Sequence, residues 1–150
     1  MNVATLLKAK GVRVVTTHGE SSIQTLTHIM TLERIGALVV TSQEDGRIVG
    51  IISERDVVRG LTEHGAAVLK MRVSDLMTRS VKTCGPQDGI KHVMAVMTRG
   101  RIRHLPVVDG SGLGGMISIG DVVKYRLEEM ELEVNVLRDA CITGRAALAS

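Results

Sequence analysis

The spacing of apolar residues changes along the chain, and the same succession of spacings occurs twice. In the first half, a β-branched stretch predicts a strand, and apolar residues three and four apart after a pair of serines predict a capped helix. Two apolar runs around a polar loop that contains a glycine predict a pair of strands, and a second helix follows. The predicted elements are a strand at 12–17, a helix capped by Ser21 or Ser22, strands at 37–41 and 48–52 around the loop 43–47, and a helix from Asp56.

The second half repeats this order of strand, helix, strand, strand and helix. Its two later strands flank a glycine-rich turn, much as the corresponding strands flank a loop in the first half. A connection at 60–71, with a loop or a short helix that ends near Gly65, joins the halves. The predicted elements are a strand at 80–84, a helix through Ile90, Val93, Met94 and Met97, strands at 105–108 and 113–118 around the turn 109–112, and a helix from Asp121.

The last helix is predicted to be unusually long. Apolar residues continue at intervals of three and four beyond the second repeat, which gives the helix a continuous apolar stripe. Such a stripe requires a partner surface, and we expect it to extend into a self-association contact. The start of the chain adds further apolar residues, which could close the module or a dimer. The stripe consists of Val123, Leu127, Met130, Val134, Leu137 and Cys141, and the residues at the start are Val3, Leu6 and Leu7.

One polar motif occurs in both halves. Residues 50–58 read GIISERDVV and residues 115–123 read GMISIGDVV, and this displacement of about 65 residues indicates a duplicated unit. A unit of about 60 residues buries too little surface to be comfortably stable alone, so we expect the halves to share one core. The chain then divides into an N-terminal extension at 1–11, repeats at 12–70 and 71–129, and a C-terminal helical extension at 130–150, within one compact module.

Composition narrows the classes of function. The net charge is +3 and Tyr125 is the one aromatic residue, so neither a phosphate-backbone footprint nor stacking on bases is expected, and we expect no nucleic-acid partner. The absence of a membrane-length apolar run and of a signal-peptide pattern favours a cytoplasmic location without a membrane partner. Cys84 and Cys141 lack a CxxC partner, and the five histidines lack a ligand spacing, so no metal site is expected.

Together these features resemble a known family, the tandem CBS (cystathionine β-synthase) domain pair, or Bateman module. The resemblance rests on the two motif runs, each preceded by a helix and an apolar strand pair, and it covers roughly residues 12–129. It implies an α+β fold of two β-α-β-β-α repeats in a pseudo-twofold arrangement, as in small stand-alone bacterial proteins of this kind. It also implies a homodimer that binds an adenosyl ligand between its repeats, namely AMP, ADP, ATP, NAD or S-adenosylmethionine.

The motif places two polar side chains where a strand passes into a helix. Ser53 and Ser118 precede helices whose first N–H groups and dipole favour a phosphate, and Asp56 and Asp121 follow three residues later, in the first helical turn. A carboxylate can accept two hydrogen bonds, which suits the vicinal hydroxyls of a ribose. By resemblance to the family, the aspartates hold the ribose and the serines approach the ribose or the phosphate. The same spacing is also close to a helix capping box, and the two roles can coexist.

The basic residues differ between the two repeats. Arg55, Arg103 and His104 each lack a basic counterpart in the other repeat. The family implies that Arg55 crosses to the cleft of Asp121, whereas Arg103 and His104 serve the cleft of Asp56 or lie between the two. Arginine suits this role because its planar fork binds phosphate oxygens bidentately. Alternatively, Arg103 and His104 are exposed positions at a sheet margin. We therefore expect the two clefts to differ in phosphate affinity.

The sequence gives weaker evidence for the adenine pocket than for the ribose and phosphate contacts. Family members line it with backbone and short side chains at the end of the first strand of each repeat, which implies Thr17 and Thr83. Both threonines could equally reflect strand propensity or a turn cap. The further candidates for the pocket wall are Ile52, Pro106 and Ile117, which also suit a hydrophobic core.

The expected function is that of a regulatory, energy-sensing module. An adenine nucleotide is its regulatory ligand, no catalytic cofactor is implied, and an unknown protein target or the last helix responds to a change in the orientation of the repeats. Ser53 has neither a histidine base in its motif nor a G-x-S-x-G elbow, so we do not expect an enzyme. Two alternatives remain open: a structural or stress-related interaction protein with vestigial clefts, and an enzyme that processes the bound nucleotide.

Overall fold

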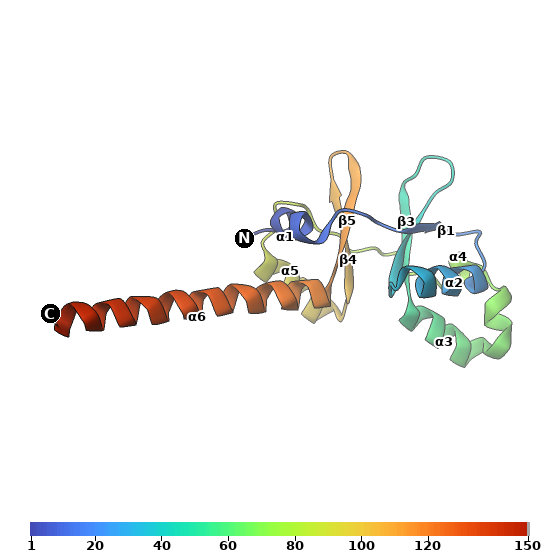
Figure 1. Cartoon of the computed structure of the whole chain (residues 1–150). Coiled ribbons are helices and arrows are strands. Elements are labelled where there is room, and N and C mark those ends of the chain that lie inside the picture. Colours follow the sequence, from blue (N-terminus) through green and yellow to red (C-terminus); the bar gives the residue numbers. More distant parts are fainter. Residues whose placement is uncertain (150) are drawn as a thin grey trace.

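The computed structural model describes the backbone of residues 1–149 and the side chains of residues 1–145. Figure 1 shows two halves side by side, each with a helix, an antiparallel strand pair and a second helix. This is the expected α+β fold of two repeats. The first half contains β1 (Thr16–His18), α2 (Ile23–Glu33), β2 (Ala37–Thr41), β3 (Ile48–Ser53) and α3 (Glu54–His64). The second contains α5 (Ile90–Gly100), β4 (His104–Asp109), β5 (Gly112–Ser118) and α6 (Ile119–Ala149). α1 (Val3–Lys10) precedes the first half, and the 3-10 helix η1 (Gly65–Lys70) and α4 (Val73–Leu76) connect the halves.

The ends of the helices follow from local side chains. The Ser22 hydroxyl accepts the Thr25 N–H at 3.1 Å and begins α2, as expected. α2 and α5 both end at an arginine in the left-handed region, Arg34 with φ 53° and Arg101 with φ 51°. This region usually holds glycine or asparagine, so two arginines at the same point of each repeat are further evidence of duplication.

The strand pairs have matching irregularities. β2 pairs antiparallel with β3, and β4 pairs antiparallel with β5. Each pair contains one shift of register, between Val40 and Thr41 in the first half and between Val107 and Val108 in the second. The two repeats therefore share the same backbone geometry at the strands that carry the Ser-x-x-Asp motif.

The first strand is shorter than expected in the first repeat and is reduced to a single bridge in the second. β1 covers Thr16–His18 rather than 12–17, and it pairs in parallel with β2. The prediction of a strand at 80–84 is wrong, since that segment forms only a single bridge, between Cys84 and Val107. The next rung toward residue 82 would need an N–H at position 106, and Pro106 has none.

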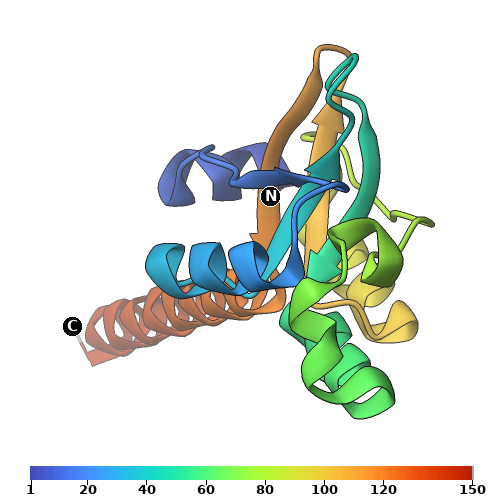
Figure 2. The same cartoon turned by 90° about the vertical axis from the view of Figure 1, so that its right-hand side faces the viewer.

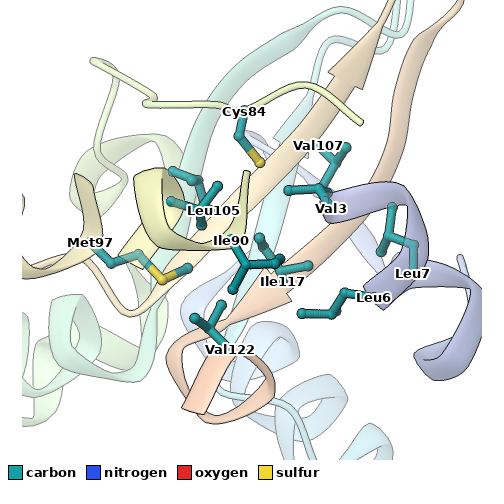
Figure 3. Packing of buried hydrophobic residues seen from close by; sticks show 11 residues of the cluster. Val3, Leu6, Leu7, Cys84, Ile90, Met97, Leu105, Val107, Ile117 and Val122 are labelled. Carbon is teal, nitrogen blue, oxygen red and sulfur yellow. The ribbon is translucent and has the colours of Figure 1, made fainter. Parts of the chain in front are cut away.

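The buried apolar side chains form two clusters, one in each half, so the expectation of one shared core is wrong. The cluster of the second half is drawn in Figure 3, where side chains from α1, α5 and the β4–β5 pair converge. The cluster of the first half draws on α2, β2, β3, η1 and α4. The second cluster consists of Val3, Leu6, Leu7, Cys84, Ile90, Val93, Met97, Leu105, Val107, Ile117 and Val122.

Each half completes its core with a helix from the segment that precedes the other half. α1 precedes the first half but packs in the second, whereas α4 precedes the second half but packs in the first. The backbone contacts are equivalent, because the Val3 N–H donates to Asp88 O at 2.9 Å and the Val73 N–H donates to Ser21 O at 2.8 Å. The apolar residues at the start of the chain therefore close the second half. This exchange of helices also holds the two halves together.

The last helix is long, as expected. α3 continues to His64 and passes into η1, so the connection between the halves is mostly helical. α6 packs its first turns on α1, α5 and β5 and then projects away from both halves (Figures 1 and 2). The extension expected at 130–150 lies within α6, apart from Ser150, which is outside the described residues.

Replacing Leu6 by alanine should destabilise the protein. Leu6 is 3% exposed in the second cluster, so Leu6→Ala should lower the free energy of unfolding by about 2–5 kcal/mol, measured by urea denaturation. Leu32 is 82% exposed on α2, and Leu32→Ala should change it by less than about 0.5 kcal/mol. Equal costs for the two variants would contradict the packing of α1 in the second core.

Candidate functional site

Ser53 and Asp56 form a reciprocal pair at the junction of β3 and α3. The Ser53 N–H and hydroxyl donate to Asp56 Oδ2 at 2.9 and 3.1 Å, and the Asp56 N–H donates to Ser53 Oγ at 3.4 Å. The second carboxylate oxygen, Oδ1, accepts a hydrogen bond from Arg59 Nη2 at 2.9 Å. The capping box and the candidate ribose contact therefore coincide. Oδ1 keeps room for another donor, because a carboxylate oxygen can accept two hydrogen bonds.

Ser118 and Asp121 repeat this geometry at the junction of β5 and α6. The Ser118 N–H donates to Asp121 Oδ2 at 2.8 Å, and the Asp121 N–H donates to Ser118 Oγ at 3.2 Å. The Asp56 side chain is 8% exposed and the Asp121 side chain is 26% exposed. The two aspartates thus have the same local role at the helix start, and they differ in what surrounds them.

A cavity of about 430 Å³ lies beside Asp56 and is lined by both halves. Such a volume falls within the range of small-ligand sites. Five of the lining residues are arginine or lysine, and two are acidic. We call this site the Asp56 cavity. Its lining residues are Gly36, Ala37, Ile51, Ser53, Glu54, Arg55, Asp56, Arg59, Thr78, Ser80, Lys82, Gly100, Arg101, Ile102, Arg103 and His104.

Two contacts join the halves at this cavity. Arg55 Nη1, from α3, donates to the carbonyl of Arg101 at 3.4 Å. His104, from β4, lies against Gly36, where an added Cβ would be 3.5 Å from the His104 ring and 3.3 Å from Glu54 Oε1. Arg55 therefore lines the cavity of Asp56, and its expected placement in the cleft of Asp121 is corrected. Arg103 and His104 lie at the Asp56 cavity, which is one of the two positions expected for them.

Lys10 occupies the corresponding place beside Asp121. Its Nζ donates to Asp121 Oδ2 at 2.5 Å and to the carbonyl of Met116 at 2.8 Å. In the first half the equivalent carbonyl, that of Ile51, instead accepts the N–H of Thr78 at 2.9 Å. α1 continues to Lys10, whereas α4 ends at Leu76 and leaves an extended segment along β3. A lysine side chain therefore lies against the Asp121 carboxylate.

The sites at Asp121 and at the Asp56 cavity also differ in charge. Burial raises the pKa of the Asp121 carboxyl, but the hydrogen bond from Lys10 and those from Ser118 outweigh it and hold the pKa below 3.8. Burial lowers the pKa of His104 below 6.5, and the positive charge of Lys10 acts in the same direction. At neutral pH Asp121 is therefore an ionised partner of Lys10, and the His104 imidazole is neutral.

The residues suggested for the adenine pocket do not line the Asp56 cavity. Ile52 and Ile117 are fully buried in the first and second hydrophobic clusters. Successive side chains of a strand point to opposite faces, so Ile51 and not Ile52 reaches the cavity wall. Pro106 and Thr17 are buried elsewhere, and Thr83 is exposed.

Four basic residues of these sites were not identified from the sequence. Arg59 lies one helical turn after Asp56, and Arg101 ends α5. Lys82 belongs to the segment expected to be a strand, and Lys10 lies outside the repeat. The spacing of three between Asp56 and Arg59 was a usable signal for an ion pair on a helix. The others are brought in by the tertiary structure.

Other kinds of site find no support in the part of the chain described. Among residues 1–145, no three His, Cys, Asp or Glu side chains gather as ligands for a metal ion. None of the described helices has both the length and the apolar composition needed to cross a membrane.

Comparison with known proteins gives a consistent picture. Residues 9–63 and 73–128 each match the family model of the CBS domain. A mitochondrial CBS domain-containing protein of Arabidopsis thaliana is 40% identical over 118 residues, which make up 77% of this chain and 57% of that protein. The chain spans between 34% and 58% of the length of the first three curated relatives.

Two solved structures are similar over most of the chain. A CBS-domain containing protein from Agrobacterium tumefaciens is 43% identical, with a TM-score of 0.81, over 84% of this chain and 99% of that one. The CBS domain pair of protein MJ0100, in complex with 5'-methylthioadenosine and S-adenosyl-L-methionine, is 25% identical, with a TM-score of 0.76, over 86% of this chain and 98% of that one.

Removing the Lys10 contact should raise the pKa of Asp121. In Lys10→Met the carboxyl keeps its burial but loses its cationic partner, so its pKa should rise above the wild-type value. A pH titration of the Asp121 carboxyl carbon by NMR measures this. Lys8 is exposed on the same helix, and Lys8→Met should leave the titration unchanged. An unchanged Asp121 pKa in Lys10→Met would contradict the contact.

Proposed function

The chain belongs to the CBS domain family, and we propose that it is a regulatory module that binds an adenine nucleotide in the Asp56 cavity. The observation that carries this proposal is a cavity of about 430 Å³ with a carboxylate at one wall and basic residues from both halves around it. The related domain pair in complex with two adenosyl compounds supports an adenosyl ligand. The proposed role is regulatory and not catalytic.

Asp56 is the proposed ribose contact. Its Oδ2 is committed to Ser53, which fixes the orientation of the carboxylate, and Oδ1 faces Arg59. The Arg59 side chain is 55% exposed, so it can move aside at small cost, because exposed ion pairs contribute little to stability. A ribose hydroxyl then replaces the guanidinium as the donor to Oδ1.

The basic residues favour a ligand that carries phosphates. Arg55 and Arg59 line the cavity from α3, Lys82 from the connecting segment, and Arg101 and Arg103 from the second half. Arginines bind phosphate oxygens bidentately. S-adenosylmethionine carries a positive sulfonium, which the same residues would repel. We therefore propose ADP or ATP as the ligand class in preference to S-adenosylmethionine.

The cleft of Asp121 is proposed to be occupied by the protein itself. Lys10 neutralises the carboxylate and also binds the carbonyl of Met116. A ribose would have to displace a lysine that makes two hydrogen bonds, to the carboxylate and to the Met116 carbonyl, whereas at Asp56 it displaces a single hydrogen bond from Arg59. This gives a physical basis for the expected difference in affinity between the two clefts.

The ligand is proposed to signal by joining the halves. α3 belongs to the first half and β4 to the second, and both line the cavity. The hydrogen bond from Arg55 to Arg101 and the packing of His104 against Gly36 connect the halves here. A nucleotide that contacts both sides favours the relative orientation that fits it, in proportion to its difference in affinity for the two orientations.

ADP and ATP should stabilise the protein against heat. A ligand at a hundred times its dissociation constant adds about 2.7 kcal/mol to the stability, which raises the melting temperature of a chain of this size by roughly 5 to 10 °C. The measurement is a melting curve with ADP, ATP, AMP, NAD and S-adenosylmethionine in turn. The largest shifts are expected with ADP and ATP, and no shift with S-adenosylmethionine. A panel without any shift would refute the proposed function.

The two aspartates should differ in their effect on binding. Asp56→Asn removes the charged acceptor of the ribose, so ADP should bind at least about tenfold more weakly in calorimetric titration. Asp121→Asn alters the equivalent cap in the other half and is the matched control, with less than about a twofold change. A larger loss of ADP affinity in Asp121→Asn than in Asp56→Asn would show that the ligand binds at Asp121 and not in the Asp56 cavity.

A further inference from the structure

The projecting part of α6 presents an apolar face to solvent. The helix leaves the second half as a single rod, and within the described backbone of residues 1–149 no other element accompanies it beyond the first turns (Figures 1 and 2). Leu127 is 55% exposed, Val134 is 48% exposed and Leu137 is 66% exposed. Helices in proteins gain most of their stability by packing an amphipathic face. This face therefore lacks the packing that such a helix needs.

The spacing of the face is that of a coiled coil. The stripe from Val123 to Cys141 alternates intervals of four and three residues, which is a seven-residue repeat. Leu127, Val134 and Cys141 occupy the a positions, and the d positions are Val123, Met130 and Leu137. A β-branched residue at a followed by leucine at d, as at Val134 and Leu137, favours two-stranded assemblies.

We propose that α6 pairs with α6 of a second copy of this chain in a parallel, in-register coiled coil. The charged residues beside the stripe are arranged for this partner. Arg126 occupies a g position and would face Glu131, an e position, of the second copy. Glu133 would face Arg138 in the same way, one heptad later. Each pair has opposite charges and is formed twice in a symmetric dimer.

An antiparallel pairing centred on the same stripe is less favourable. It would bring Lys124 of one helix next to Arg138 of the other, both of which occupy e positions and carry positive charge, and would place Glu131 next to its own copy. Arg126 already pairs with Glu129 of its own helix at 2.5 Å, and its five donors can serve a second carboxylate. The parallel arrangement avoids the repulsion and places the Asp56 cavities of both copies at the same end of the rod.

A lipid surface is a poorer partner for this face. Glu128, Glu129, Glu131 and Glu133 lie along the same stretch of α6, whereas helices that lie on membranes are rich in lysine and arginine on the polar side. The proposal concerns association only and does not depend on the ligand of the Asp56 cavity.

The first test is the oligomeric state of the full chain by size-exclusion chromatography with light scattering. The wild type should be a dimer, and Leu137→Asp should be a monomer with an unchanged melting temperature for the two halves. Leu132 is 65% exposed, close to the 66% of Leu137, but lies outside the stripe. Leu132→Asp is therefore the matched control and should remain a dimer. A monomeric wild type, or a dimeric Leu137→Asp, would overturn the proposal.

Oxidation of Cys141 tests whether the two α6 helices are parallel. In a parallel, in-register pair the two Cys141 thiols face each other, and diamide should oxidise them to a disulfide that links the dimer covalently, with diamide reduced by the two electrons and two protons. Cys84 is 7% exposed, and burial raises the pKa of its thiol to about 11, so it should not react. The covalent dimer should persist in Cys84→Ser and disappear in Cys141→Ser and in Leu137→Asp. A dimer that does not cross-link through Cys141 would overturn the parallel arrangement.

Discussion

The structure depends on the exchange of two short helices between its halves. A repeat of about 60 residues buries little surface and is marginally stable alone, and each half here gains further apolar side chains from the segment in front of the other half. α1 and α4 make equivalent backbone bonds, from Val3 to Asp88 and from Val73 to Ser21. The exchange ties the halves into one unit although their cores are separate. It also brings α3 and β4 close enough to line one cavity.

The same exchange makes the two sites unequal. Both helices lie beside a Ser-x-x-Asp junction, but α1 continues for a further turn and places Lys10 at Asp121, whereas α4 ends at Leu76 and is followed by Thr78 and Ser80, which line the Asp56 cavity. The junctions themselves are nearly identical, since the Ser53 and Ser118 N–H groups donate to their aspartates at 2.9 and 2.8 Å. The difference in chemistry thus comes from the segments outside the repeat motif. The two junctions thus share a backbone geometry and differ in the side chain that contacts the aspartate, which is Arg59 at Asp56 and Lys10 at Asp121.

The sequence alone predicted what depends on local pattern. The repeat, the order of helices and strands, the cap at Ser22 and the Ser-x-x-Asp junctions all follow from spacing and residue type over short distances. The gathering of Arg103 and His104 at the Asp56 cavity was one of the alternatives that the family resemblance offered. Which face of β3 carries Ile52 was not predicted, because the motif fixes the order of residues but not the side of the strand that meets the core.

Longer-range effects could not be predicted. The expected strand at 80–84 fails because of Pro106, which lies on the strand that would pair with it. Lys10 and Asp121 are 111 residues apart in the chain, and nothing in the sequence around either residue indicates the other. The pattern of apolar residues also does not specify that the core divides into two clusters, one completed by α1 and the other by α4.

The number of nucleotides bound per chain tests the central claim most directly. Isothermal titration of this chain with ADP should give one site per chain, because the Asp56 cavity is the proposed ligand site and Lys10 pairs with the carboxylate of Asp121. A stoichiometry of two would contradict the closure of the second cleft. Saturable binding that is retained in full when Asp56 is replaced by asparagine would contradict the assignment of the first.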